Sequence, residues 1–150
     1  MSKSSSNTVS PAEVIEKSGA DILRLWVASS DYSEDLKIGP EIIKSNIDSY
    51  RRLRNTLRFI LGNLSDFDQD EKVSVDELDE LDLYILSELE SLKKEVISNY
   101  KIFEYQKVFS AIFNFCTNDL SSFYFDIRKD TLYCDSKNNK VRKSTRTVLD

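Results

Sequence analysis

The sequence predicts a mainly α-helical protein, built as a helical bundle, and three observations lead to this prediction. Only three glycines and two prolines occur in 150 residues, so few positions favour a turn. Apolar residues recur at steps of three or four along extended segments, which is the period of a helix with one buried face. Apolar residues make up 40% of the chain and charged residues 31%, a balance typical of a globular domain with a core.

Two short helices are predicted near the N-terminus. Residues 10–13 read Ser-Pro-Ala-Glu, the pattern of a capping box with proline at the first helical position, and Gly19 is placed to end this helix. A second helix should cover residues 20–29. Residues 36–39 should form a short extended segment before the next helix begins.

A long helix beginning at Pro40 has the clearest pattern in the chain. Its apolar positions are Ile43, Ile47, Tyr50, Leu53, Leu57, Ile60 and Leu64. Its basic positions, away from this stripe, are Lys44, Arg51, Arg52, Arg54 and Arg58. Residues 41–62 have a net charge of +3, although the whole chain has −5. The basic face could follow the phosphates of a nucleic acid, to which arginine binds well, or could be solvated surface.

The second half of the chain is predicted to contain further helices. A capping box at residues 74–77 should open a long helix, with an apolar face formed by Leu78, Leu81, Ile85, Leu89, Leu92 and Val96. The next helix, from about Tyr105, should bury Val108, Phe109, Ile112, Phe113, Cys116, Leu120 and Phe123. Residues 141–149 have the pattern of the first turns of another helix. Net charge is −9 over residues 63–95 and +4 over residues 128–150. The basic residues of segment 128–150 could therefore bind a polyanion locally.

The acidic segment between these helices has the spacing of a calcium loop. Asp66, Asp68, Asp70 and Glu77 occupy positions 1, 3, 5 and 12 of an EF-hand. Position 6, where the loop needs glycine, is Glu71. We therefore expect a solvated acidic loop without a metal, and a calcium-binding helical protein remains an alternative.

Several classes of function are disfavoured by composition. The chain has no histidine, so the commonest general base near neutral pH is missing. Cys116 and Cys134 have no metal-ligand spacing, and we expect two reduced thiols in a cytoplasmic protein. No apolar run is long enough for a membrane span. Aromatic residues in segment 122–130, together with Tyr133, could stack on bases, but aromatics at helical spacing more often pack in a core, which we favour.

Four segments resemble isoleucyl-tRNA synthetases, which are class I aminoacyl-tRNA synthetases. Residues 1–4 (Met-Ser-Lys-Ser) match the end of the family's Lys-Met-Ser-Lys-Ser loop, without its first lysine and with Ser6 in place of the usual glycine. Residues 7–11 (Asn-Thr-Val-Ser-Pro) and 19–29 (Gly-Ala-Asp-Ile-Leu-Arg-Leu-Trp-Val-Ala-Ser) follow in register. Residues 50–56 resemble the first helix of the family's anticodon-binding domain.

The resemblance implies a helical bundle of the class I synthetase anticodon-binding type, preceded by a flexible loop and a small helical connecting region. Residues 1–39 would be the end of the catalytic domain, and residues 40–150 the N-terminal part of the bundle, cut at its C-terminus. In the family, the lysine that corresponds to Lys3 binds the ATP phosphates during activation. Lys3 would then be the catalytic residue, with Ser2 and Ser4 as its ATP-binding neighbours.

The parent enzyme would activate isoleucine with ATP and Mg²⁺ and transfer it to tRNA(Ile), as a cytoplasmic monomer. The chain by itself would be inactive and would retain no cofactor. Its contacts with tRNA would come from Lys44, Arg51, Arg52, Arg54 and Arg58. The main alternative is a stand-alone helical RNA-binding module.

Overall fold

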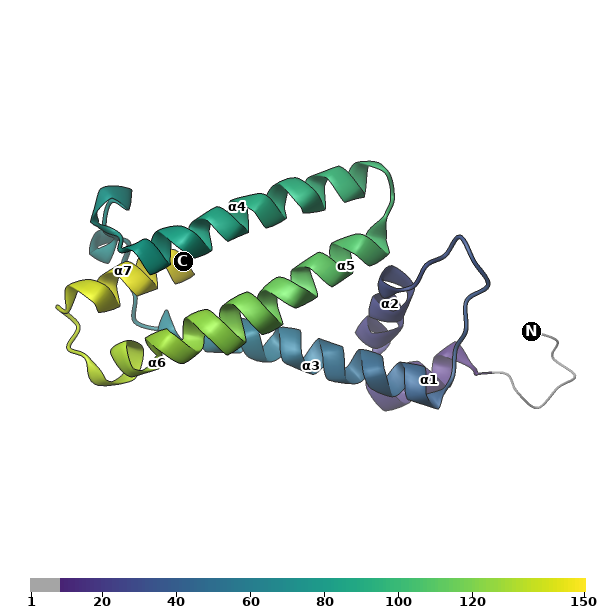
Figure 1. Ribbon diagram of the computed structural model, residues 1–150. Helices are drawn as coiled ribbons and strands as arrows, with labels where there is room; N and C mark the ends of the chain where they lie inside the picture. The colour runs from purple at the N-terminus through teal and green to yellow at the C-terminus, as the bar shows by residue number, and fades with distance from the viewer. Residues whose placement is uncertain (1–8) are drawn as a thin grey trace, which may run out of the picture.

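The structure is a computed structural model that describes residues 9–150 (Figure 1). These residues form helices joined by turns and loops, and none of them lies in a strand, which confirms the mainly α-helical prediction. The main elements are α1 (Pro11–Ser18), α2 (Ala20–Ser29), α3 (Pro40–Asn63), α4 (Glu80–Lys101), α5 (Tyr105–Asn114), the π-helix η3 (Phe115–Tyr124), α6 (Phe125–Cys134) and α7 (Lys140–Leu149). Within this range no helix combines the length and apolarity that a membrane crossing requires.

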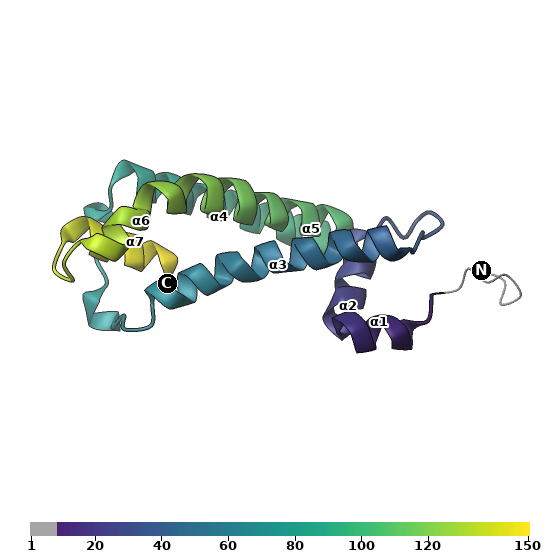
Figure 2. The same cartoon turned by 90° about the horizontal axis from the view of Figure 1, so that it is seen from below.

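The bundle is elongated, with a small pair of helices at one end. In Figure 2, α3 runs from the α1–α2 pair to the end of the bundle that carries α7. α5, η3 and α6 form one continuous helical segment between α3 and α4 (Figure 1). Two cores result, one where α1 and α2 meet the start of α3, and one where α4, η3 and α6 meet the end of α3.

The first helix begins and ends where the sequence predicts, but one detail of the prediction is wrong. α1 begins at Pro11 and stops before Gly19, whose φ of 86° lies in the left-handed region that glycine tolerates. The Ser10 side chain makes no capping hydrogen bond, so the predicted capping box at residues 10–13 is not formed. The fixed φ of proline is sufficient to start the helix at this position.

α3 buries different faces in its two halves. Ile43 packs against α1 and α2, whereas Phe59 and Ile60 pack against the second core and Thr56 is buried. At about 100° per residue, Ile43 and Phe59 point about 160° apart. The single apolar stripe predicted for this helix is therefore wrong at Leu57, which is 57% exposed, although Ile60 of the stripe packs in the second core. The cause is tertiary, because α2 and η3 contact α3 on different sides.

The π-helix changes which residues are buried in the second half of the chain, so the predicted core there is partly wrong. A π-helix bonds residue i to i+5, so each turn holds nearly one residue more than an α-turn. Over the ten residues of η3 the buried face shifts by about two residues, or about 200°. Phe123, the last residue of the predicted stripe, is consequently exposed, while Tyr124 and Phe125 are buried.

The long helix α4 begins later than the sequence predicts. The capping box is present, because the Glu77 carboxylate accepts a hydrogen bond from the Ser74 backbone N–H at 3.1 Å. It opens only a short 3₁₀ turn, since Leu78 has an extended backbone with ψ of 147°. The cap of α4 itself is Asp79, whose carboxylate accepts the backbone N–H of Asp82 at 2.9 Å.

Candidate nucleic-acid interface

The five predicted RNA-contacting residues all lie on α3 and all are exposed: Lys44, Arg51, Arg52, Arg54 and Arg58. Among them, Arg51 has a carboxylate neighbour, with Nη1 3.5 Å from Asp48 Oδ1. An exposed ion pair of this kind holds a guanidinium only weakly. The basic face is thus open to a polyanion.

These residues do not form one uniform patch. Lys44 and Arg52 line a hollow of about 470 Å³ between α3 and α5, with Phe113 among its other lining residues. Arg58 lies further along α3 and faces a different hollow, toward α6. The structure therefore separates the predicted stripe into a part beside α5 and a part beside α6.

A groove of about 310 Å³ lies between α3 and α6, next to Arg58. Its lining residues are Asn55, Thr56, Phe59, Ser121, Phe125, Asp126, Lys129 and Tyr133. It shares Asn55, Phe59 and Tyr133 with the hollow beside Arg58, which has a volume of about 440 Å³. The two together form a continuous depression along the basic end of α3.

Aromatic rings form the apolar part of this groove. Phe59 of α3 stacks on Phe125 of α6 with ring centroids 4.3 Å apart, and Tyr133 meets Phe59 edge-on at 6.1 Å. Tyr133 is 67% exposed, so most of its ring faces solvent. The prediction that the aromatic segment packs in the core holds for Tyr124 and Phe125, and is wrong for Phe123 and Tyr133.

Polar groups surround the rings. Lys129 Nζ lies 2.7 Å from Asp126 Oδ1, and this hydrogen bond raises the pKa of Lys129, so the lysine stays protonated at neutral pH. The amide of Asn55 and the guanidinium of Arg58 lie on the α3 side. An open aromatic ring with an amide and cations beside it can take an unpaired nucleobase and hold the adjacent phosphates.

The sequence did not indicate Asn55, Phe59 or Ser121 as site residues. Phe59 and Tyr133 are far apart in the chain, and only the packing of α6 on α3 brings them together. One sequence feature could have pointed to Asn55: it is an uncharged residue on a face of the predicted helix that otherwise carries charged residues. Position alone gives no sign of a groove.

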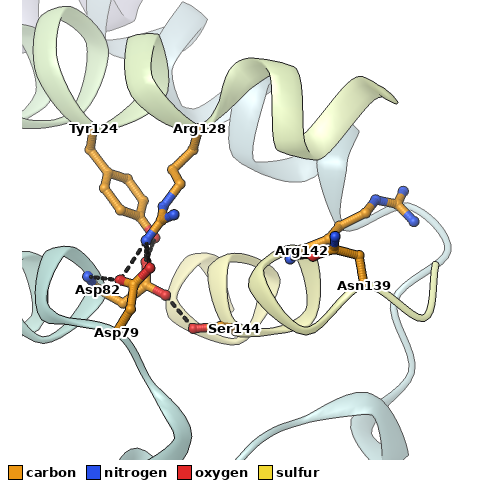
Figure 3. Close-up of polar contacts among 7 residues, drawn as sticks. All are labelled: Asp79, Asp82, Tyr124, Arg128, Asn139, Arg142 and Ser144. Atoms are coloured by element: carbon orange, nitrogen blue, oxygen red, sulfur yellow. Dashed lines mark hydrogen bonds and ion pairs between the residues drawn. The ribbon is translucent and has the colours of Figure 1, made fainter. Parts of the chain in front are cut away.

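Two arginines of the second basic region, residues 128–150, are used inside the fold. Arg128 is buried and its Nη2 lies 3.0 Å from Asp82 Oδ1, while it also bonds the Asp79 carboxylate (Figure 3). Arg146 is 1% exposed and pairs with Asp66 at 2.7 Å and Glu71 at 3.3 Å. These guanidiniums are not available to a polyanion.

A buried polar cluster ties α4 to the helices around it. The Asp82 carboxylate accepts hydrogen bonds from the Tyr124 hydroxyl at 2.6 Å and from the Ser144 hydroxyl of α7 (Figure 3). Burial, and the hydrogen bond to this carboxylate, raise the pKa of Tyr124 well above its ordinary value. One feature of the sequence indicates this cluster. Asp82 lies three residues before Ile85, so a helix places this carboxylate on the predicted buried face.

The acidic segment does not form a calcium loop. The Asp66 carboxylate forms ion pairs with Arg146 and with Lys137, the latter at 2.5 Å. The Glu77 carboxylate accepts a hydrogen bond from the Ser74 backbone N–H. The Asp68 carboxylate accepts the backbone N–H of Asp70 at 3.3 Å. The carboxylates thus face different partners. Between residues 9 and 150, no group of three or more His, Cys, Asp or Glu side chains is arranged to share a metal ion.

The predicted ATP-binding residues Ser2, Lys3 and Ser4 lie outside the described residues. Comparison with known proteins covers this part of the chain. Residues 1–39 match the family of class I tRNA synthetases (I, L, M and V), and residues 82–150 match the anticodon-binding domain of tRNA ligase. The chain is 54% identical over its whole length to an isoleucine–tRNA ligase of Ruegeria pomeroyi, and 48% identical to one of Pelagibacter ubique.

The chain matches isoleucine–tRNA ligases along its whole length. An isoleucine–tRNA ligase of Petrotoga mobilis is 51% identical over 99% of the chain. The chain spans 16% of the length of this relative and of the Ruegeria pomeroyi relative. These matches confirm the resemblance of the chain to isoleucyl-tRNA synthetases. The match to the anticodon-binding domain includes α6, which carries one wall of the groove.

Proposed function

We propose that this chain supplies the RNA-binding helices of an isoleucine–tRNA ligase. The ligase would activate isoleucine with ATP and Mg²⁺ and transfer it to tRNA(Ile), in the cytoplasm and as a monomer. Residues 1–39 would end the catalytic domain, and residues 40–150 would form the first part of the anticodon-binding bundle. Lys3 would meet the charge that grows on the ATP phosphates as pyrophosphate leaves, with Ser2 and Ser4 beside it.

The observation that carries the proposal is the pairing of the basic end of α3 with the α3–α6 groove. Arg54 and Arg58 provide the charge that draws a phosphate backbone, and Tyr133 provides an open ring for stacking. An unpaired base is the ligand that uses both features. A base inside a duplex could not reach the ring, so we assign the groove to a single-stranded loop of the tRNA.

The test measures binding of this chain to a labelled tRNA transcript by fluorescence anisotropy, over a range of salt concentrations. Exchanging Arg54 and Arg58 for glutamate should weaken binding at least tenfold and flatten the salt dependence, because phosphate contacts are lost. The matched control exchanges Lys93 and Lys94, two exposed lysines of α4, for glutamate and should change affinity little. Equal losses in the two variants would show attraction by overall charge and would contradict the proposal.

The catalytic part of the proposal is tested separately. Since the chain spans about one sixth of its relatives' length, we expect no ATP–pyrophosphate exchange from residues 1–150 by themselves. In a longer protein that contains the chain, Lys3→Ala should reduce that exchange by orders of magnitude, whereas the loss with Arg58→Glu should appear mainly in the KM for tRNA. Measurable exchange by residues 1–150 would show that they contain a full catalytic site.

A further inference from the structure

The floor of the α3–α6 groove contains a pair of hydroxyl groups. Thr56 is 3% exposed, and its Oγ1 lies 3.0 Å from Ser121 Oγ. Ser121 belongs to the π-helix and is exposed to the groove. Both residues line the groove beside Tyr133, so a base stacked on that ring would bring its polar edge near them.

The hydrogen bonds of this pair determine what the floor offers to a ligand. A serine hydroxyl has one proton and two lone pairs. Ser121 donates its proton to the Cys116 carbonyl at 2.7 Å, the shortest contact of the pair. Ser121 then has no proton for Thr56, and Thr56 can give its own proton either to Ser121 Oγ at 3.0 Å or to the Arg52 carbonyl at 3.1 Å. In either case Ser121 Oγ keeps at least one lone pair free to accept a hydrogen bond, on a residue that lines the groove.

We propose that Ser121 is a specificity-determining residue of the RNA site, and that it selects a base with an N–H donor over a base edge with acceptors only. The 6-amino group of adenine is such a donor. Rotating the Ser121 hydroxyl to donate instead would break its bond to Cys116. This inference rests on the function proposed above, because it assumes that the groove receives a base.

The experiment compares two labelled hexamers, one of adenosine and one of purine riboside, which has the same ring system without the 6-amino group. The wild-type chain should bind the adenosine hexamer about two- to tenfold more tightly, the range of one hydrogen bond. Ser121→Ala should lower the affinity for adenosine to that for purine riboside and leave the latter unchanged. Tyr133→Ala should weaken both.

Ser122→Ala is the matched control. Ser122 donates to the Thr117 carbonyl at 2.8 Å, five residues back, as Ser121 does to Cys116, but it does not line the groove. Its replacement should leave the adenosine preference intact. If Ser121→Ala fails to fold by circular dichroism, the comparison of the two hexamers on the wild-type chain decides the question.

Equal wild-type affinity for the two hexamers would overturn the role of Ser121. If Tyr133→Ala still weakened both in that case, the proposed RNA site would stand without it. Failure of either hexamer to bind, in a chain that binds tRNA through Arg58, would remove the groove from the site and the inference with it. Failure to bind tRNA at all would contradict the proposed function itself.

Discussion

The Tyr124 hydroxyl donates a hydrogen bond to Asp82 at 2.6 Å, and both side chains are fully buried. The bond joins the π-helix to α4. Arg128 and Ser144 contact the same carboxylate, so its charge is both balanced and hydrogen-bonded. The position of α6, and with it Tyr133 in the α3–α6 groove, depends on this hydrogen bond.

Tyr124→Phe should destabilise the protein by about 1–3 kcal/mol. The ring would keep its packing, but Asp82 would lose a buried donor. Urea denaturation followed by circular dichroism measures the change. Tyr133→Phe is the control and should be neutral within about 0.5 kcal/mol, because that side chain is mostly exposed. Equal effects of the two substitutions would show that the bond to Asp82 contributes nothing.

Stability should fall when the pH drops below about 4. Partial burial works to raise the pKa of Asp79, but the hydrogen bonds from Arg128 and from the Asp82 backbone outweigh it and lower the pKa. A carboxylate with a lowered folded pKa stabilises the fold above its unfolded pKa of about 3.9. That contribution is lost as the pH falls through the folded value. Urea titrations at pH 7, 5, 4 and 3 will show the trend.

Asp79→Asn separates this charge effect from helix capping. Asparagine caps a helix as well as aspartate does, so α4 should keep its N-terminus. The variant should be less stable than wild type at pH 7, and the difference should narrow toward pH 3. A difference that is independent of pH would mean that the Asp79 charge is not responsible.

Arg146→Ala should cost about 3 kcal/mol, the lower end for a broken buried ion pair, because Asp66 and Glu71 keep some contact with water. The Arg146 guanidinium also lies 5.0 Å from the centre of the Phe67 ring. Hydrogen exchange of residues 65–79 should accelerate in this variant. Lys137→Ala removes an exposed partner of Asp66 and should cost less than about 1 kcal/mol.

Tyr133→Ala should weaken RNA binding by about 1–3 kcal/mol, the contribution of one stacked base. Tyr133→Phe should bind like wild type, since the ring is retained. Tyr84→Ala removes another exposed aromatic, on α4, and controls for a general loss of apolar surface. Anisotropy with the labelled tRNA measures all three, and a weaker complex with Tyr133→Phe would argue against stacking.

The helical class, most helix bounds and the resemblance to isoleucyl-tRNA synthetases follow from the sequence alone. Sparse glycine and proline, periodic apolar residues and the motif segments within residues 1–29 are all local properties of the chain, so they can be recognised without the fold. The basic residues of α3 are exposed as their spacing predicts. Whether they contact RNA is still a prediction.

Tertiary contacts decided the rest. The buried face of α3 changes along its length because α2 and η3 pack on different sides, and a periodic pattern cannot state which neighbour covers which turn. The π-helix rotates everything after Phe115, which exposes Phe123 and buries Tyr124. Hydrogen bonds from i to i+5 leave no period in the sequence. The groove beside Tyr133 exists because residues that are more than seventy positions apart in the chain meet there, and only packing can bring them together.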